Sequence, residues 1–348
     1  MTTTDPPLLA PYTSLHVGGP AAKLAMPTSR QAVLELLDST NDETQLQLFG
    51  YGCNSLISDD GLPGTTIIWR GGDIRQDGDV VVTDAGVWWD ELVRYCIDQG
   101  LWGLELTSEI PGSVGAGVFG NIAAYGQQIS DTLLWIEVFD RTSHQTRRLT
   151  KQDISFSYRE SSLQVSPELC ILQAAFSLSR QPLHAVRYDT ILTVAEELSV
   201  DLATLDGRRQ ATIETRRRAG SLWHFDDPTA QRTAGSFFKN PLVTPEQAVH
   251  LAAYDESGKT LERINRQNKV HGGSSHRASA AHVLLASGFA RGQTWGNVRL
   301  HPDHVLKIET LPGATAQDVY AVSQEIIATV QAKLNITITP EVRFFGTF

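Results

Sequence analysis

The alternation of hydrophobic and polar positions predicts strands and helices in turn along the first hundred residues. Runs rich in β-branched or apolar residues predict strands at 46–49, 66–69 and 80–83. A helix is predicted after Thr28 and Gln31, which have the spacing of a capping box. A second helix is predicted to end at Gly100. Its apolar face is formed by Trp88, Trp89, Leu92, Val93, Cys96 and Ile97.

The later pattern continues this mixture. Strands are predicted at 133–140, 169–178 and 336–345. Helices are predicted near 188–198 and 208–218, after Thr244, and in a long amphipathic stretch that Thr315 opens with Asp318. Residues 254–276 are polar and follow neither period, and the polar and aromatic segment 220–239 indicates a domain boundary. The pattern therefore predicts an α/β or α+β protein.

The net charge of the chain limits the kinds of molecule that the protein is expected to bind. The 348 residues carry 29 Lys and Arg against 39 Asp and Glu, a formal net charge of −10. This balance disfavours a general binder of nucleic acid or of anionic membranes, because the protein's field repels phosphate. A small anionic ligand in a local basic pocket stays compatible with it. The arginine-rich stretch 208–218 fits either a solvated helix face or an edge that contacts phosphate.

The sequence also predicts where the protein works. No Lys or Arg precedes Lys23, so we expect no secretory signal, and no run approaches the roughly 18–20 apolar residues of a membrane span. Cys53, Cys96 and Cys170 are far apart and form no CxxC pair, which indicates free thiols in a reducing compartment. We therefore expect a cytoplasmic protein.

Two glycine-rich loops are the main candidates for chemistry. The first, residues 50–58, follows a predicted strand, and its backbone N–H groups are suited to an anion. It lacks the third glycine of a dinucleotide-binding turn, although an ordinary strand turn stays open. The second, residues 110–126, has too many small residues for a regular helix or strand. It fits the close approach of backbone to a flat, phosphate-bearing ligand, or else a tightly packed crossing of elements.

In this order and spacing, the two loops resemble those of the UDP-N-acetylenolpyruvoylglucosamine reductase (MurB) family, flavoenzymes of bacterial cell-wall synthesis. The resemblance continues in YTSLHVGGPA at 12–21, FSYRESSL at 156–163, GSFFKNP at 235–241 and PEVRFFG at 340–346. It implies an α+β protein with an FAD-binding fold of the vanillyl-alcohol-oxidase type, in which two subdomains hold the flavin and a third binds substrate.

By this resemblance we expect a first flavin subdomain at 1–75, to which residues 337–348 return. A second flavin subdomain is expected at 76–225 and a substrate domain at 230–336. The expected FAD contacts are Gly50, Gly52, Cys53, Asn54, Ser55, Leu56, Ile110, Pro111, Gly112, Ser113, Gly115, Ala116, Asn121, Ala124, Tyr125 and Gly126.

The resemblance implies reduction of an enolpyruvyl ether to a lactyl ether with electrons from NADPH. Such an alkene accepts hydride well only when its carboxylate can take up charge as an enediolate, so positive charge and donors at that carboxylate should dominate catalysis. Arg159 suits this task because a guanidinium binds a carboxylate through two parallel bonds. Glu341 would have to be protonated or share a proton. Ser236 matches the general acid, and we expect Lys239 to ease off its proton.

Each of these residues also has a structural reading: Arg159 as a surface ion pair, Glu341 as a strand-edge charge and Ser236 as a turn former. Asn240 fits either a substrate contact or a turn cap before Pro241. The expected substrate contacts are Tyr158, Tyr188, Arg218, Lys239, Asn240 and Arg277. His301 and His304 have a spacing that metal ligands use, but Pro302 and the lack of a third ligand lead us to expect no metal.

The chain departs from the family pattern in several places. Cys53 replaces a serine, Glu109 stands beside the second glycine-rich loop where a small or apolar residue is usual, and Ala219 replaces a lysine that meets substrate phosphates. These changes leave open a paralogue that uses the same hydride chemistry on another enolpyruvyl or unsaturated acid, or a flavin-binding protein without catalysis. We expect a monomer that binds a nucleotide-sugar substrate and neither nucleic acid nor membrane.

Overall fold

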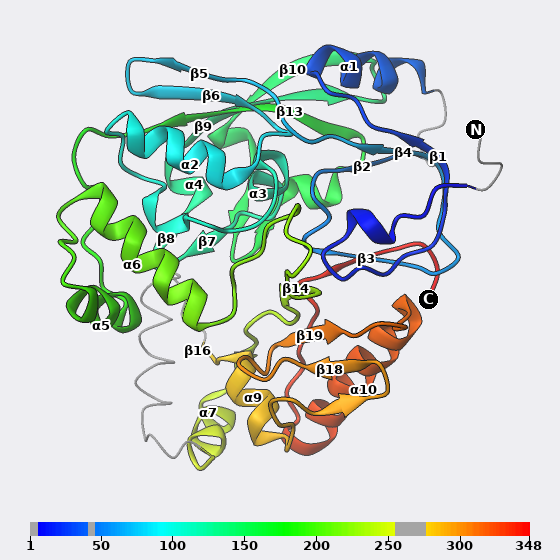
Figure 1. Ribbon diagram of the computed structural model, residues 1–348, viewed down its shortest axis with the longest axis vertical. Coiled ribbons are helices and arrows are strands. Elements are labelled where there is room, and N and C mark those ends of the chain that lie inside the picture. The colour runs from blue at the N-terminus through cyan, green and yellow to red at the C-terminus, as the bar shows by residue number, and fades with distance from the viewer. Residues whose placement is uncertain (1–5, 41–45, 255–275) are drawn as a thin grey trace. The chain divides into compact units, whose positions relative to one another are not determined.

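The computed structural model describes residues 6–40, 46–254 and 276–348 (Figure 1). The chain divides into two compact units. Unit 1 contains residues 1–7, 21–52 and 63–230, and unit 2 contains residues 8–20, 53–62 and 231–348. The first glycine-rich loop therefore begins in unit 1 and ends in unit 2.

The largest sheet of unit 1 is antiparallel and has the strand order β10-β9-β13-β6-β5. Its strands are β5 (Ile74–Asp77), β6 (Val80–Asp84), β9 (Leu133–Asp140), β10 (Gln145–Thr150) and β13 (Leu169–Ser177). Helices α2 (Trp89–Asp98) and α3 (Val114–Phe119) lie along one face of it (Figure 1). Trp89, Val118 and Phe176 belong to the resulting core, whose burial is the main stabilising contribution to this unit.

A three-stranded sheet with the order β1-β4-β2 completes the N-terminal part of unit 1. It is built from β1 (Ala21–Ala25), β2 (Leu46–Phe49) and β4 (Leu62–Ile68), and α1 (Arg30–Ser39) adds Val33 and Leu37 to the core. The remaining elements of unit 1 are η3 (Glu105–Thr107), β7 (Ala123–Ala124), β8 (Gln127–Gln128), α4 (Ile129–Thr132), η4 (Lys151–Asp153), β11 (Phe156–Ser157), β12 (Glu160–Ser161), η5 (Ser162–Val165), α5 (Asp189–Leu198) and α6 (Leu205–Arg218).

Unit 2 is built on a four-stranded sheet with the order β14-β19-β18-β17. Its strands are β14 (Thr233–Ser236), β17 (Thr294–Trp295), β18 (Val298–Leu300) and β19 (Lys307–Thr310). Apolar side chains from this sheet, α9 (Ala280–Ala286) and α10 (Ala316–Leu334) share one core. The other elements are η1 (Ala10–Tyr12), β3 (Ser55–Ile57), β15 (Leu242–Val243), α7 (Pro245–Ala252), β16 (His276–Arg277) and β20 (Arg343–Phe345).

Most predicted elements are confirmed, with corrections at their ends. Ser29 caps α1 through a bond from the Ala32 N–H, so the predicted Thr28 cap is wrong by one residue. The predicted closing strand 336–345 shrinks to β20, which pairs in parallel with β3. Most of the segment 254–276 lies outside the described residues. The predicted α+β character is confirmed: the two largest sheets are antiparallel, and each shares a core with helices.

The second glycine-rich loop contains a helix, which the sequence reading did not expect. In α3 the small residues serve close packing: a Cβ on Gly115 would lie 2.8 Å from the Cβ of Ala85, and one on Gly117 would lie 3.0 Å from Ile129. Ser113 caps this helix by accepting a bond from the Ala116 N–H. Tertiary contacts therefore outweigh the weak helix propensity of glycine.

Candidate functional site

The two glycine-rich loops meet inside unit 1 at Gly50 and Ser113. A Cβ placed on Gly50 would lie 2.5 Å from Oγ of Ser113 and 2.8 Å from its Cβ. Gly112, just before Ser113, has a φ of +136° and no atom within 4 Å of an added Cβ. Its backbone is therefore open to a ligand on one side, while Gly50 holds the loops together on the other.

We expect Gly50→Ala to weaken the binding of FAD about tenfold, because the new methyl group displaces Ser113 and with it the start of α3. Fluorescence of released flavin on dilution measures the dissociation constant. Gly120→Ala is the matched control, since Gly120 has a φ of −89° and its added Cβ would come no closer than 3.4 Å to Ala116. Equal flavin affinity in both variants would contradict the expectation.

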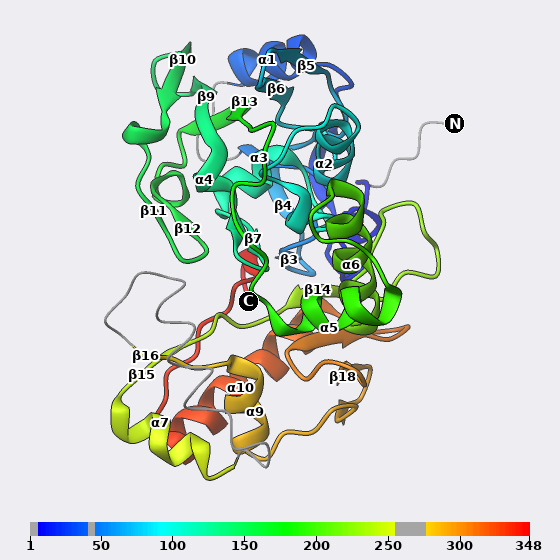
Figure 2. The ribbon, with the colours of Figure 1, turned by 90° about the vertical axis from the view of Figure 1, so that its left-hand side faces the viewer.

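Arg159 lies in the turn of the β11–β12 hairpin, which Figure 2 shows. Its φ of +58° is uncommon for a residue with a side chain, and such conformations concentrate at functional sites. Nη1 of Arg159 donates to the backbone oxygen of Ala123 at 2.9 Å. Asn121 donates to the backbone oxygen of Ser157 at 2.9 Å. The hairpin is thus fastened to the second glycine-rich loop.

Three tyrosines gather around Arg159. The rings of Tyr125 and Tyr188 meet edge to face with centroids 5.8 Å apart, and the guanidinium of Arg159 lies 5.9 Å from the centroid of Tyr158. Burial, followed by the neighbouring Tyr158, raises the pKa of Tyr188, against the opposing charge of Arg159. Three residues proposed for substrate or catalysis, Arg159, Tyr158 and Tyr188, therefore lie beside Tyr125, a proposed flavin contact.

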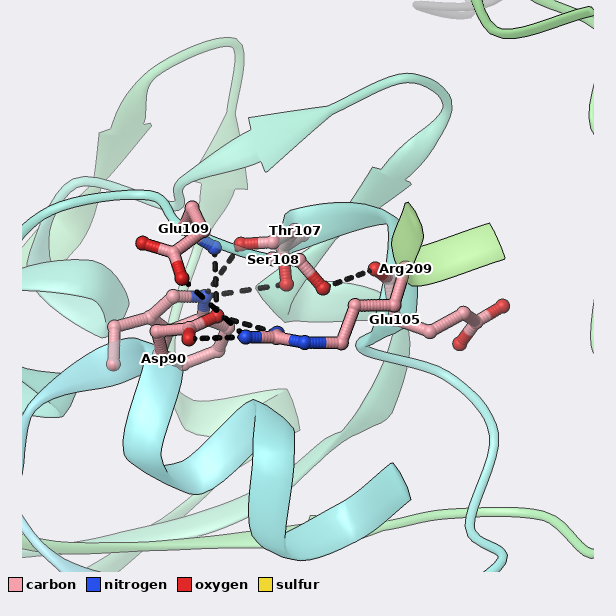
Figure 3. Close-up of polar contacts among 7 residues, drawn as sticks. Asp90, Glu105, Thr107, Ser108, Glu109 and Arg209 are labelled. Atoms are coloured by element: carbon pink, nitrogen blue, oxygen red, sulfur yellow. Dashed lines mark hydrogen bonds and ion pairs between the residues drawn. The ribbon is translucent and has the colours of Figure 1, made fainter. Parts of the chain in front are cut away.

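A buried network that the sequence reading missed holds the entry to the second glycine-rich loop (Figure 3). Arg209 of α6 forms two bonds with Asp90 of α2, at 2.8 and 2.7 Å, and lies 3.4 Å from the carboxylate of Glu109. Asp90 also accepts the backbone N–H of Glu109 at 2.7 Å. Residues 119 positions apart thus fix the backbone just before Ile110.

The pKa values of the two carboxylates of this network shift in opposite directions. Burial by itself would raise the pKa of Asp90, but the bonds from Arg209 and from the Glu109 N–H lower it. Burial and the neighbouring Asp90 raise the pKa of Glu109. Glu109 also has a φ of +59°, so its backbone conformation is one that the network must hold in place.

The arginines of α6 thus divide into two sets. Neither of the two interpretations of this stretch, a solvated helix face or an edge that contacts phosphate, predicted this division. Arg208 is buried and pairs with the buried Glu105 at 2.8 Å, as Arg209 pairs with Asp90. Arg217 and Arg218 are exposed and pair with Glu214, and Arg218 also with Glu197. The proposed substrate contact Arg218 is therefore engaged by acidic side chains in this structure.

Removing the Arg209 charge should destabilise the protein by about 3 kcal/mol, because it leaves the buried carboxylate of Asp90 without its cation. In Arg209→Met the folded-state pKa of Asp90 should rise above its unfolded value, so the deficit should be largest near pH 8 and shrink toward pH 5. Urea unfolding at both pH values measures this. Arg217→Met, on the exposed face of the same helix, should show no such deficit. A deficit independent of pH would argue against buried charge as its cause.

In unit 2, Ser236 ends a bulged strand. β14 pairs with β19 through Thr233 opposite Glu309 and Ser236 opposite Lys307, with a register shift between the two pairs. Gly235 has a φ of +77°, which a residue with a side chain rarely adopts. Bulges of this kind re-aim a side chain and are common beside active sites. Because of this bulge, the side chain of Ser236 does not follow the regular alternation of side chains between the two faces of the sheet.

Glu341 lies close to the same strand. Its backbone N–H donates to the backbone oxygen of Phe237, the residue after Ser236, at 2.8 Å. Its backbone oxygen accepts from the side chain of Asn54 at 3.1 Å. Asn54 belongs to the part of the first glycine-rich loop in unit 2. Unit 2 therefore brings two of the three proposed catalytic residues and one proposed flavin contact together, while Arg159 belongs to unit 1.

The remaining proposed substrate residues of unit 2 form one small cluster. Arg277 donates to the oxygen of Asn240 at 2.6 Å, and the side-chain oxygen of Asn240 accepts from the N–H of Ala280, the first residue of α9. Asn240 therefore contributes to the start of this helix. The N–H of Lys239 donates to the oxygen of Thr339, which places Lys239 beside the segment that leads to Glu341.

Several buried donors of unit 1 find no acceptor among the described residues: Nε1 of Trp69, Nε1 of Trp223 and Nε of Arg216. Arg216 also hydrogen-bonds Tyr125, and the Trp223 ring lies 6.3 Å from Trp88, whose backbone pairs with Ser113. Buried donors normally have partners. These three donors have almost no accessible surface in this structure, so the open backbone at Gly112 is the better candidate for contact with a phosphate-bearing ligand.

None of the three cysteines forms a disulfide, and burial raises the pKa of Cys170 to about 11. Within the described ranges, no helix combines the length and apolar character of a membrane span. The same ranges contain no group of three His, Cys, Asp or Glu residues placed to hold a metal ion.

Comparisons with known proteins agree with this architecture. Residues 21–147 match the model of an FAD binding domain, and residues 227–345 match that of the C-terminal domain of UDP-N-acetylenolpyruvoylglucosamine reductase. The crystal structure of that reductase from Thermus caldophilus superimposes with a TM-score of 0.66, covers 98% of both chains and is 23% identical, which supports the same fold.

Relatives with that name are similar along almost their whole length. The protein from Thermobifida fusca is 31% identical over 346 residues, which cover 97% of this chain and 96% of the relative. The protein from Salinispora arenicola is 32% identical over 345 residues, which cover 96% and 93%. The resemblance inferred from the sequence is thereby confirmed, and the chain belongs to the UDP-N-acetylenolpyruvoylglucosamine reductase family.

Proposed function

We propose that this protein reduces the enolpyruvyl ether of UDP-N-acetylglucosamine enolpyruvate to the lactyl ether of UDP-N-acetylmuramate in peptidoglycan synthesis, with FAD as bound cofactor and NADPH as reductant. The observation that carries the proposal is the extent of the family relationship, which includes both the FAD-binding region and the C-terminal domain. A paralogue with a different acid substrate is not favoured, because the match to the C-terminal domain runs through 227–345.

The two glycine-rich loops would hold FAD, which when bound and reduced by NADPH would supply the hydride for the enolpyruvyl methylene carbon. Arg159 binds the substrate carboxylate through two parallel bonds and stabilises the enediolate that forms. Protonated Glu341 donates to the same group. Ser236 gives its proton to the ether-bearing carbon. The fastening of Arg159 to the second glycine-rich loop supports this division of roles, because a rigid donor loses little energy to reorganisation during the reaction.

The residues of the two glycine-rich loops that were expected to contact FAD keep that role in the proposal, and the approach of Gly50 to Ser113 supports it. We also place the enzyme in the cytoplasm as a monomer. Its three cysteines form no disulfide, which supports a reducing compartment, and light scattering during gel filtration tests the monomeric state.

The deciding experiment is anaerobic reoxidation. The purified yellow protein is reduced with one equivalent of NADPH and then mixed with UDP-N-acetylglucosamine enolpyruvate. Return of flavin absorbance near 450 nm, roughly where oxidised flavins absorb, together with a product heavier by two hydrogen atoms, is the expected result. A flavin that NADPH reduces but this substrate leaves reduced would overturn the proposed substrate.

A further inference from the structure

β19 places a buried lysine directly opposite the proposed general acid. Lys307 is the cross-strand partner of Ser236, and only 2% of its surface is exposed. A buried lysine is rare unless its charge is used or matched, because its ammonium group is expensive to remove from water. This residue was not singled out by any sequence motif.

The backbone hydrogen bonds show what kind of cross-strand pair these two residues form. The N–H of Lys307 donates to the oxygen of His304, and the N–H of His301 donates to the oxygen of Lys307. The N–H and the C=O of Lys307 thus both face the connection that follows β18 and not β14. The bond that joins the two strands here runs instead from the N–H of Phe237, just after β14, to the backbone oxygen of Leu306, just before Lys307. Ser236 and Lys307 therefore form a non-hydrogen-bonded pair, the kind in which opposed side chains approach most closely.

The alternation along β19 puts Lys307 on the polar face of the sheet. Leu306 and Ile308 belong to the core of unit 2, so Lys307 and Glu309 point to the opposite face. Glu309 is engaged by Arg299 at 2.7 Å. Burial and then the neighbouring Lys307 lower the pKa of His304 to about 4. Lys307 is therefore the basic side chain on this part of the sheet closest in register to Ser236.

We propose that Lys307 is a positioning residue for the protonation step, acting through Ser236. As the enediolate collapses to the carboxylate, its electron pair forms the new C–H bond at the ether-bearing carbon. The O–H bond of Ser236 breaks and leaves its electron pair on Oγ. The ammonium of Lys307 stabilises that alkoxide until water returns a proton. Such an ionic interaction at short range favours the charged form of the serine. The inference rests on the proposed function.

The test compares Lys307→Met and Lys307→Arg with Lys333→Met in anaerobic stopped flow. Lys333, on α10, donates to the backbone of Ser287 and serves as the matched lysine of the same unit. We expect Lys307→Met to slow reoxidation by UDP-N-acetylglucosamine enolpyruvate about 100-fold, the usual cost of losing one preorganised charge partner. Reduction by NADPH should stay within about twofold of wild type, and Lys307→Arg should recover most of the lost rate.

Several outcomes would overturn the inference: an unchanged reoxidation rate in Lys307→Met, an equal slowing of both half-reactions, or no rescue by arginine. If Lys307→Met does not retain FAD, a second measurement decides. Lys307→Gln then replaces Lys307→Met, and Lys307→Gln/Ser236→Ala should reoxidise no more slowly than Ser236→Ala alone, whereas an additive loss would contradict action through Ser236. Wild-type protein that fails to reoxidise would instead refute the proposed function itself, and the role of Lys307 with it.

Discussion

Ser236→Ala should abolish reduction of the enolpyruvyl substrate while leaving reduction of the flavin by NADPH intact. The proposed role of Ser236 is to donate a proton only after hydride transfer, so its loss should slow the oxidative half-reaction by about 10²- to 10⁴-fold, the range for a general acid. Stopped-flow absorbance of the flavin separates the two half-reactions. The bulge at Gly235 is a backbone feature, so we expect the alanine variant to keep it.

Ser287→Ala is the matched control for this prediction. Its hydroxyl is buried in the same unit and bonds to the backbone oxygen of Val283 at 2.9 Å, so its removal tests the cost of losing a serine as such. This variant should turn over normally. Loss of both half-reactions in Ser236→Ala would refute the assignment of Ser236, because a fault common to both steps points to folding or flavin binding.

Arg159→Met should slow the same oxidative half-reaction by about 10²- to 10³-fold, because the enediolate loses its guanidinium. Arg159→Lys should recover only part of this rate, since an ammonium keeps the charge but cannot form two parallel bonds in one plane. Reduction by NADPH should change little in either variant. The rate constants come from the same stopped-flow traces, read as a function of substrate concentration.

Arg148 provides the control for Arg159. It lies exposed on β10, with its guanidinium 4.0 Å from the centroid of Trp135, and has no proposed role in binding or catalysis. Arg148→Met should keep both half-reactions at the wild-type rate. If Arg159→Lys restores full activity, a single positive charge suffices, and the proposal that Arg159 binds the substrate carboxylate through two parallel bonds is wrong. If Arg159→Met retains full activity, the role of Arg159 is structural, as in its bond to Ala123.

Much of the fold could be predicted from local patterns. The apolar face that includes Trp89, Leu92 and Val93 predicted α2, and Gly100 follows it with a φ of +69°. The pair Thr315 and Asp318 forms the predicted capping box of α10. Such features depend on residues within one or two turns of each other, so they can be recognised from a short stretch of sequence.

The second glycine-rich loop shows where local patterns fail. Glycine is a poor helix former, yet α3 forms because Ser113 caps it and because only small residues fit against Ala85 and Ile129. The two explanations left open for this loop also turn out to be compatible. Gly115 and Gly117 serve packing, whereas Gly112 leaves its backbone open to a ligand.

The sequence by itself determined the α+β class, most helices and strands, the family and its FAD chemistry, because these reside in short motifs whose order is preserved along the chain. Only the tertiary structure decided that Arg209 belongs with Asp90 and that Lys307 faces Ser236. Both pairs depend on how distant segments pack or on the register of paired strands. A shift of one residue in β19 would turn Lys307 to the other face of the sheet, and no local pattern near either residue specifies that register.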